Sequence, residues 1–134
     1  MYIGGFQKIS LSDYPGKISC VIFTAGCNFR CVYCYNRPLV LKEYFPPPIP
    51  FEEIEIYLKK RKGLIDAVVF CGGEPTVQPD LIEYMEKVKK MGFSIKLDTN
   101  GALPGVIVKC IEKKLVDYIA MDVKAPLEKY NEIV

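Results

Sequence analysis

The chain alternates between short apolar runs and longer stretches in which apolar residues recur every three or four positions. Four runs rich in β-branched and aromatic residues predict buried strands, at Lys17–Phe23, Asp66–Phe70, Phe93–Leu97 and Tyr118–Met121. Helical spacing predicts amphipathic helices between them, at Phe51–Lys60, Pro79–Met91 and Gly105–Lys114. Buried strands that alternate with amphipathic helices indicate an α/β fold with a parallel sheet and right-handed crossovers.

Several segments do not follow this alternation. Phe6–Leu11 is interpreted as a short extended piece, and Ser12–Gly16 as a turn. Thr24–Pro38 is a loop dense in cysteine, asparagine, glycine and aromatic residues, whereas Leu39–Tyr44 fits no element clearly. The prolines of Phe45–Pro50 exclude a helix interior or a central strand, so this segment is predicted to be a stiff spacer.

Length and composition narrow the class of protein. The 134 residues suffice for one domain, predicted to span 1–134, and with half of them apolar they can bury a core. The net charge of +2 is spread along the chain, which argues against nucleic acid or a membrane surface as partner. No signal peptide or membrane span is predicted, so we expect a cytoplasmic protein whose six cysteines are ligands or core residues rather than disulfides. The absence of histidine removes the commonest general base and zinc co-ligand.

The chemically distinctive clusters each follow a predicted strand. Three cysteines come after the first strand, Gly72-Gly73-Glu74-Pro75 after the second, Asp98-Thr99-Asn100-Gly101 after the third, and Asp122-Val123-Lys124 after the fourth. The carboxyl ends of parallel strands meet at one rim of the sheet, where the working residues of such folds lie. The sequence therefore predicts one site built from four clusters.

The three cysteines of the loop suggest an iron–sulfur cluster. Cys27, Cys31 and Cys34 place three thiolates on one short segment, and three ligands leave one iron of a [4Fe–4S] cubane open to a small molecule. A zinc site or buried structural thiols are the alternatives, but structural zinc commonly has four closed ligands. A fourth thiolate would have to come from outside the loop, from Cys20, Cys71 or Cys110. Cys20 and Cys110 are interpreted as core or packing residues.

Cys-x3-Cys-x2-Cys after the first strand of a β/α repeat resembles the radical S-adenosylmethionine (SAM) superfamily. The resemblance implies a partial (β/α) barrel, a [4Fe–4S] cluster on the three cysteines, and SAM as the second cofactor. It also implies that Tyr33 lies near the adenine, and that the Gly72–Pro75 motif contacts the amino group of the methionine moiety. Glycines permit close backbone approach, and Glu74 can accept hydrogen bonds from an ammonium.

A finer resemblance is to the activating enzymes of glycyl radical enzymes, closest to the anaerobic ribonucleoside-triphosphate reductase activating type. Gly5–Lys17, Lys96–Gly101 and Asp117–Pro126 carry it, and the likeness covers nearly the whole chain. It implies a monovalent cation near the SAM carboxylate, surrounded by Asp98, Thr99 and Asp122. The cofactor-binding residues implied are Tyr33, Gly72, Gly73, Glu74, Asp98, Thr99, Asn100, Asp122 and Lys124; none is implied as a catalytic residue.

The sequence departs from this group at three places. Tyr35 stands where histidine is common after the third cysteine, and Cys71 where serine or threonine is usual, which is interpreted as a small-residue replacement. The related proteins continue into a fifth and sixth β/α unit, whereas this chain stops at Val134. We therefore expect four β/α units, with the C-terminal units missing.

The resemblance implies reductive cleavage of SAM to a 5′-deoxyadenosyl radical, which abstracts hydrogen from a glycine of a partner of the anaerobic ribonucleotide reductase or pyruvate formate-lyase type. An external donor such as flavodoxin or ferredoxin, and an anaerobic setting, are implied as well. Two alternatives stay open: a radical SAM enzyme acting on a small molecule such as a deazaguanine precursor, and a non-catalytic iron–sulfur or zinc-binding fragment.

The last predicted strand raises the question of the sheet edge. Tyr118–Met121 is apolar and lacks the charges or proline that protect an edge strand. We therefore expect either a truncated form or pairing with a second chain, for which a homodimer through this edge is the hypothesis.

Overall fold

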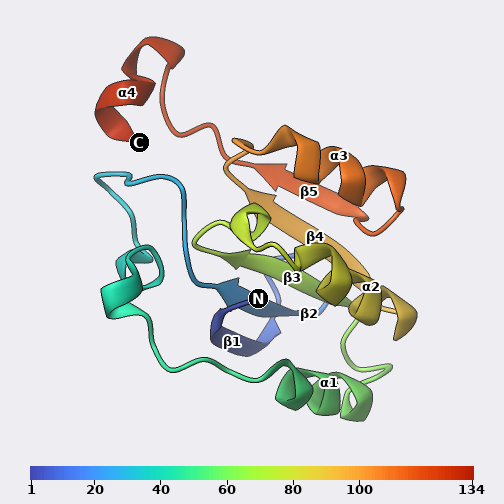
Figure 1. The fold of residues 1–134 in the computed structure, drawn as a ribbon. Coiled ribbons are helices and arrows are strands. Elements are labelled where there is room, and N and C mark those ends of the chain that lie inside the picture. The colour runs from blue at the N-terminus through green and yellow to red at the C-terminus, as the bar shows by residue number, and fades with distance from the viewer.

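The computed structural model describes residues 1–134 and contains one five-stranded sheet, with the strands side by side in chain order (Figure 1). The strands are β1 (Ile3–Ser10), β2 (Ser19–Thr24), β3 (Ala67–Gly72), β4 (Ser94–Thr99) and β5 (Tyr118–Met121). β2 to β5 are parallel, and β1 runs antiparallel to β2. The α/β class is confirmed, and the sheet is open rather than closed into a barrel.

Helices connect the parallel strands as the sequence predicts. They are α1 (Phe51–Lys60), α2 (Leu81–Lys90) and α3 (Pro104–Glu112), and a short α4 (Tyr130–Ile133) follows β5. Four 3-10 turns lie at Arg37–Leu39, Lys42–Tyr44, Pro75–Val77 and Leu127–Lys129. Figure 1 shows α4 away from the other helices, beside the light-blue segment that follows β2. The unassigned segment Leu39–Tyr44 thus contains the last residue of one 3-10 turn and the whole of the next.

The main core lies between the sheet and helices α1 to α3. Alternate residues of the strands point to this side, because successive side chains of a strand face opposite ways. Its largest fully buried members are Phe70, Ile3, Ile22, Ile54, Leu58, Leu81, Met85, Ile95 and Leu97. Cys20 and Cys110 are completely buried in the same core, which confirms their interpretation as packing residues. The opposite face carries a smaller cluster of Tyr14, Val21, Ala67 and Val69.

The first strand is longer than the sequence predicts. The extended piece expected at Phe6–Leu11 is the strand Ile3–Ser10, which pairs with β2 and shows irregular register at two places. Gly4 and Gly5 weaken the strand pattern, and glycine in a strand marks close packing or a bulge. A side chain on Gly4 would begin 2.5 Å from Leu39 Cδ2, so the end of the Leu39 side chain would have to move to make room for it.

The central strands also extend further toward the rim. β3 reaches Gly72 and β4 reaches Thr99, because pairing continues to Thr24 opposite Gly72 and Met121 opposite Thr99. Residues predicted to follow these strands are therefore their last members, and the sheet itself fixes their positions.

β5 forms one edge of the sheet, with 41% of Tyr118 and 60% of Met121 exposed. The turn and helix that follow it leave the sheet, and α4 buries none of its residues. No helix of the chain combines the length and apolar character needed to cross a membrane.

Candidate functional site at the rim of the sheet

One cavity of about 190 Å³ lies where strands β2 to β5 end; we call it the rim cavity. All twelve site residues expected from the sequence line it: Cys27, Cys31, Tyr33, Cys34, Gly72, Gly73, Glu74, Asp98, Thr99, Asn100, Asp122 and Lys124. The four clusters that are distant in sequence are therefore neighbours in space. Their roles in binding remain predictions.

Gly72 and Gly73, at the end of β3, allow two segments of the backbone to pack closely together. Gly72 has φ +117°, and a side chain there would begin 2.4 Å from the backbone of Thr24. A side chain on Gly73 would begin 2.2 Å from the carbonyl oxygen of Gly26. The Gly73 N–H donates to the Thr24 carbonyl at 2.8 Å. The close approach expected of these glycines is therefore made to the segment that leads into the cysteines.

Glu74 is almost fully buried, with 1% of its surface exposed, and four donors hold its carboxylate. Oε1 accepts from the Thr76 N–H at 3.0 Å, from Thr76 Oγ1 at 2.5 Å and from Thr99 Oγ1 at 2.7 Å. Oε2 accepts from the Asn100 N–H at 2.7 Å. Oε1 is fully engaged by its three donors, whereas Oε2 has a single donor and retains an acceptor position.

Asn100 joins the Glu74 turn to the cysteine loop, which we define as residues 25–36. While its backbone donates to Glu74, its side-chain Nδ2 donates to Asn28 Oδ1 at 2.8 Å and lies 4.0 Å from Cys27 Sγ. Its Oδ1 accepts from the Ala102 N–H at 3.0 Å, which fixes the side-chain orientation. Asn28 was not singled out from the sequence, and the asparagine-rich composition of the loop was the only signal for it.

The three cysteines are partly buried and line the rim cavity together. The Phe29 N–H donates to Cys27 Sγ at 3.4 Å, and burial raises the pKa of the Cys27 thiol. Hydrogen bonds to ligand sulfurs are typical of iron–sulfur sites. No three cysteine, aspartate or glutamate side chains surround a single point as they would around one metal ion.

The two rim aspartates each have their own lysine. Lys96 Nζ lies 2.7 Å from Asp98 Oδ1 in an ion pair without hydrogen-bond geometry, and Lys124 Nζ lies 2.5 Å from Asp122 Oδ2. Burial raises the pKa of Asp98, and the ion pair with Lys96 opposes that rise. Each rim carboxylate therefore has its own cationic partner within the chain. The monovalent cation stays a prediction.

Further residues line the rim cavity that the sequence did not assign to it: Phe29, Tyr35, Asn36, Val40 and Cys71. Burial and the charge of Asp98 raise the pKa of Cys71 to about 11, so its thiol is protonated at neutral pH. Cys71 is the last residue but one of β3, outside the cysteine loop. Its position at the end of a predicted strand, next to the Gly72-Gly73 motif, was the sequence signal that could have assigned Cys71 to the site.

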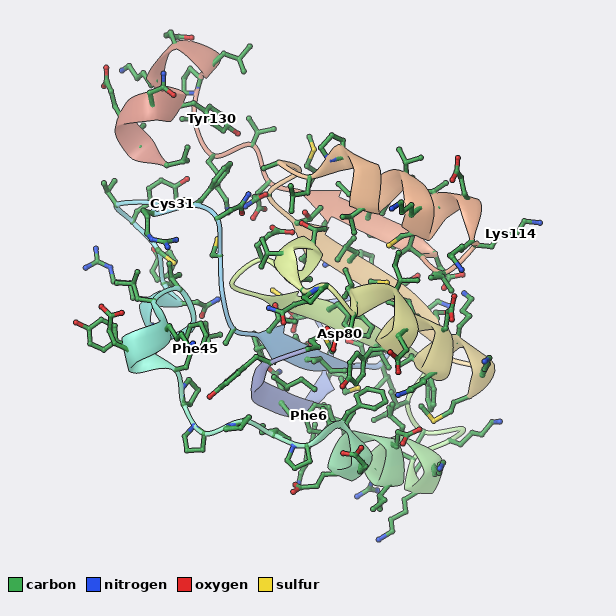
Figure 2. The ribbon with its side chains drawn as sticks, in the orientation of Figure 1. Phe6, Cys31, Phe45, Asp80, Lys114 and Tyr130 are labelled. Carbon is green, nitrogen blue, oxygen red and sulfur yellow. The ribbon has the colours of Figure 1, made fainter.

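The C-terminal segment lies against the cysteine loop. The Tyr33 hydroxyl donates to the Lys124 carbonyl at 2.9 Å, and the Val32 N–H donates to the Ile133 carbonyl at 3.1 Å. The rings of Phe29 and Tyr130 are 6.5 Å apart, and Figure 2 shows Tyr130 on the helix beside the loop that carries Cys31. Lys124 is thereby held at the mouth of the rim cavity.

Comparison with known proteins gives a consistent result. The radical SAM superfamily matches residues 21–134. A Methanocaldococcus jannaschii protein named "Putative glycyl-radical enzyme activating enzyme" is 42% identical, with 98% of this chain and 54% of that protein aligned. A 7-carboxy-7-deazaguanine synthase of Thermococcus kodakarensis is 32% identical, with 87% of this chain and 53% of that protein aligned.

The solved structure of QueE from Escherichia coli has a similar fold, with a TM-score of 0.59 at 20% identity. The alignment covers 75% of this chain and 52% of that one. The chain spans about half the length of the curated relatives it matches.

Proposed function

The chain belongs to the radical SAM superfamily, and from this premise we propose that it binds a [4Fe–4S] cluster through Cys27, Cys31 and Cys34 and cleaves SAM reductively. The observation that carries the proposal is the rim cavity, in which three cysteines of one loop face Glu74 and the ends of β4 and β5. When bound, the cluster supplies the electron that splits SAM into methionine and a 5′-deoxyadenosyl radical.

The residues of the chain have distinct tasks in this proposal. Glu74 Oε2 accepts a hydrogen bond from the SAM ammonium, because Glu74 lines the rim cavity and Oε2 has a single donor, whereas Oε1 is engaged by Thr76 and Thr99. Tyr33 lies over the adenine, with its hydroxyl already bonded to the Lys124 carbonyl. Lys124 lines the cavity, and its ammonium, which has two further N–H donors beside the one directed at Asp122, donates to the SAM carboxylate.

The partner that we propose is a glycyl radical enzyme. The 42% identical relative carries that name, and the sequence resembles activating enzymes along nearly its whole length. In this reaction the radical takes one hydrogen atom from a glycine of the partner, which leaves 5′-deoxyadenosine and a glycyl radical. The chain spans about half the length of this relative. The activity of a complete activating enzyme is therefore proposed for this chain and does not follow from the match alone.

A small-molecule substrate is the second candidate. The 32% identity to a 7-carboxy-7-deazaguanine synthase supports it. The two candidates share the cluster and SAM but differ in the product, because only an activating enzyme leaves a stable radical on a protein.

Anaerobic reconstitution tests the proposal. We expect about four irons per chain and formation of 5′-deoxyadenosine once SAM and a reductant are added. Cys27→Ala, Cys31→Ala and Cys34→Ala should abolish both, whereas Cys71→Ala should retain the iron. A candidate glycyl radical enzyme is then added and its radical sought by electron paramagnetic resonance. Iron that depends on Cys71 but not on Cys27, or a cluster that never cleaves SAM, would refute the assignment and favour a non-catalytic metal-binding fragment.

A further inference from the structure

A second cavity lies on the other side of the cysteines. It has a volume of about 290 Å³ and is lined by Arg30, Cys31, Val32, Cys34, Arg37, Val40, Leu41 and Tyr44. The two cavities have only Cys31, Cys34 and Val40 in common, so these residues form the wall between them. We call the second one the arginine cavity. A group held by Cys31 and Cys34 would therefore be reached from two directions.

The arginine cavity is positively charged. Its lining contains two arginines and no acidic residue. The wider segment of residues 25–45 has three basic side chains, Arg30, Arg37 and Lys42, and one acidic side chain, Glu43. The rim cavity differs, because Glu74, Asp98 and Asp122 contribute carboxylates there. The two openings thus present different charges to a partner.

Hydrogen bonds fix both arginines beside the cysteines. Arg30 Nη1 donates to the carbonyl oxygens of Cys27 and Phe29, each at 2.7 Å. Arg37 Nη2 donates to the Val32 carbonyl at 2.7 Å. A guanidinium has five N–H donors, so each arginine retains donors for an acidic partner while its charge stays in place.

Exposed apolar and aromatic groups surround this charge. Val32 is 61% exposed and Tyr44 is 62% exposed, although both line the cavity. Arginine and tyrosine are enriched in protein interfaces, where an aromatic centre is combined with charged groups that orient the partner. The surface therefore has the composition of a contact for another protein rather than of a site for a small molecule.

We propose that the arginine cavity is the docking surface for a small acidic one-electron carrier, a low-potential flavin or iron–sulfur protein. The proposal rests on the proposed function, which requires an external electron. One electron leaves the reduced carrier and enters the cluster beside Cys31 and Cys34, so that the carrier is oxidised by one electron and the cluster reduced by one. The rim cavity stays free for SAM and substrate, because the carrier approaches from the other side of the wall.

Charge-removing variants test the docking surface. Arg30→Gln/Arg37→Gln is compared with Lys59→Gln/Lys60→Gln, which removes the same charge from exposed positions at the end of α1. The measurement is the rate at which the absorbance of the reconstituted cluster bleaches with flavodoxin hydroquinone. We expect a decrease on the order of ten-fold at low ionic strength for the arginine variant, which fades at high salt. The α1 variant should react as fast as the unmodified chain.

A cationic reductant distinguishes a loss of carrier docking from damage to the cysteine loop. Reduced methyl viologen is positively charged and small, so its rate should not fall when the arginines are removed. Lys42→Gln is a second variant, because Lys42 is exposed and its side chain makes no hydrogen bond to the loop. We expect this variant to slow the reaction with flavodoxin about two-fold. Binding of flavodoxin to the chain without its cluster, followed by nuclear magnetic resonance, should weaken in the same order of variants.

Two results would overturn the docking surface: a flavodoxin rate and affinity insensitive to all three basic residues, or an equal loss in the α1 variant. A loss of rate with methyl viologen as large as that with flavodoxin would also count against it. Failure of the proposed function looks different. In that case methyl viologen reduces the cluster but no 5′-deoxyadenosine forms from SAM, whichever variant is used.

Discussion

The Gly72–Thr76 turn and the cysteine loop face the same cavity, but the protein holds them in different ways. In the turn, Glu74 is buried and bonded to four donors that come from its own turn and from β4. In the loop the cysteines are only partly buried, and Tyr35 is 98% exposed. The comparison indicates that folding alone orders the turn, and we expect the cysteine loop to become fully ordered only when the proposed cluster binds.

The largest expected effect on folding follows removal of the Glu74 carboxylate. Glu74→Ala would leave the Asn100 N–H and the Thr76 N–H buried without acceptors, so we expect the free energy of unfolding to fall by about 3 to 5 kcal/mol. SAM binding should weaken as well. Urea unfolding measures the first effect and isothermal titration of the reconstituted chain the second. Glu112→Ala, at an exposed position, is the control. An unchanged stability would show that the turn is not held as described.

A methyl group at Gly73 should have the next largest effect. It would lie 2.2 Å from the Gly26 carbonyl oxygen, so either the turn or the start of the cysteine loop must move. We expect Gly73→Ala to cost about 1 to 3 kcal/mol. Gly105→Ala is the matched control, because nothing lies within 4 Å of that position in α3 and alanine favours a helix. In thermal melting, Gly73→Ala should lower the melting temperature and Gly105→Ala should raise it.

The pH dependence of folding stability should distinguish Asp98, which lines the rim cavity, from Asp117, which does not. Burial raises the pKa of Asp98 above 3.8, so its ionisation opposes folding, and the stability that it contributes at low pH is lost as pH rises through the raised value. For Asp117, burial acts to raise the pKa, but the Lys89 ammonium and the Ile95 N–H hold it below 3.8. Its stability is present at neutral pH and is lost as pH falls through that lowered value.

The test is urea unfolding of Asp98→Asn and Asp117→Asn between pH 3 and pH 7. Relative to the unmodified chain, the stability of Asp98→Asn should decline as the pH is lowered through the Asp98 pKa, and that of Asp117→Asn should improve at the acidic end. Parallel curves for the two variants would contradict the assigned environments.

The smallest expected effect on folding is at the cysteine loop. Without metal, Cys27→Ala, Cys31→Ala and Cys34→Ala should each change the free energy of unfolding by less than about 0.5 kcal/mol, although they abolish the cluster. Cys110→Ala should cost on the order of 1 kcal/mol, because its thiol is buried against Met85.

Hydrogen exchange then sharpens the comparison between the two regions. We expect amides of residues 27–34 to exchange rapidly in protein prepared in air and to become protected after reconstitution. The Asn100 amide, bonded to Glu74, should be protected in both states. Protection of the loop before reconstitution would show that folding alone orders the loop as well.

The sequence by itself determined the fold class, the order of the elements and the residues that gather at the rim. Helical spacing placed the helices and a short apolar run placed the last strand, Tyr118–Met121, because burial imposes a pattern that survives in one dimension. Parallel strands bring their carboxyl ends to one rim, so the four clusters could be expected to meet before any distance was known.

The sequence predicted only part of the antiparallel strand β1. The rest of this strand depends on its pairing with β2 and on close packing at its glycines, which are tertiary contacts. The local pattern around Gly4 and Gly5 is weak, whereas pairing with β2 and the contact with Leu39 decide the strand. The same holds for the lengths of β3 and β4, which end where their neighbours stop pairing rather than where the apolar run ends.

Only the tertiary structure decided what each rim residue touches. The glycines at 72 and 73 are needed by the backbone of Thr24 and Gly26, and Lys96 and Lys124 are the counter-ions of the two aspartates. The glycine contacts join positions far apart in the chain, whereas each lysine is only two residues from its aspartate; in neither case does a local pattern encode which group will face another. The sequence therefore identifies the members of the site, and the packing of the folded chain sets their pairings, because hydrogen bonds depend on distance and direction rather than on order along the chain.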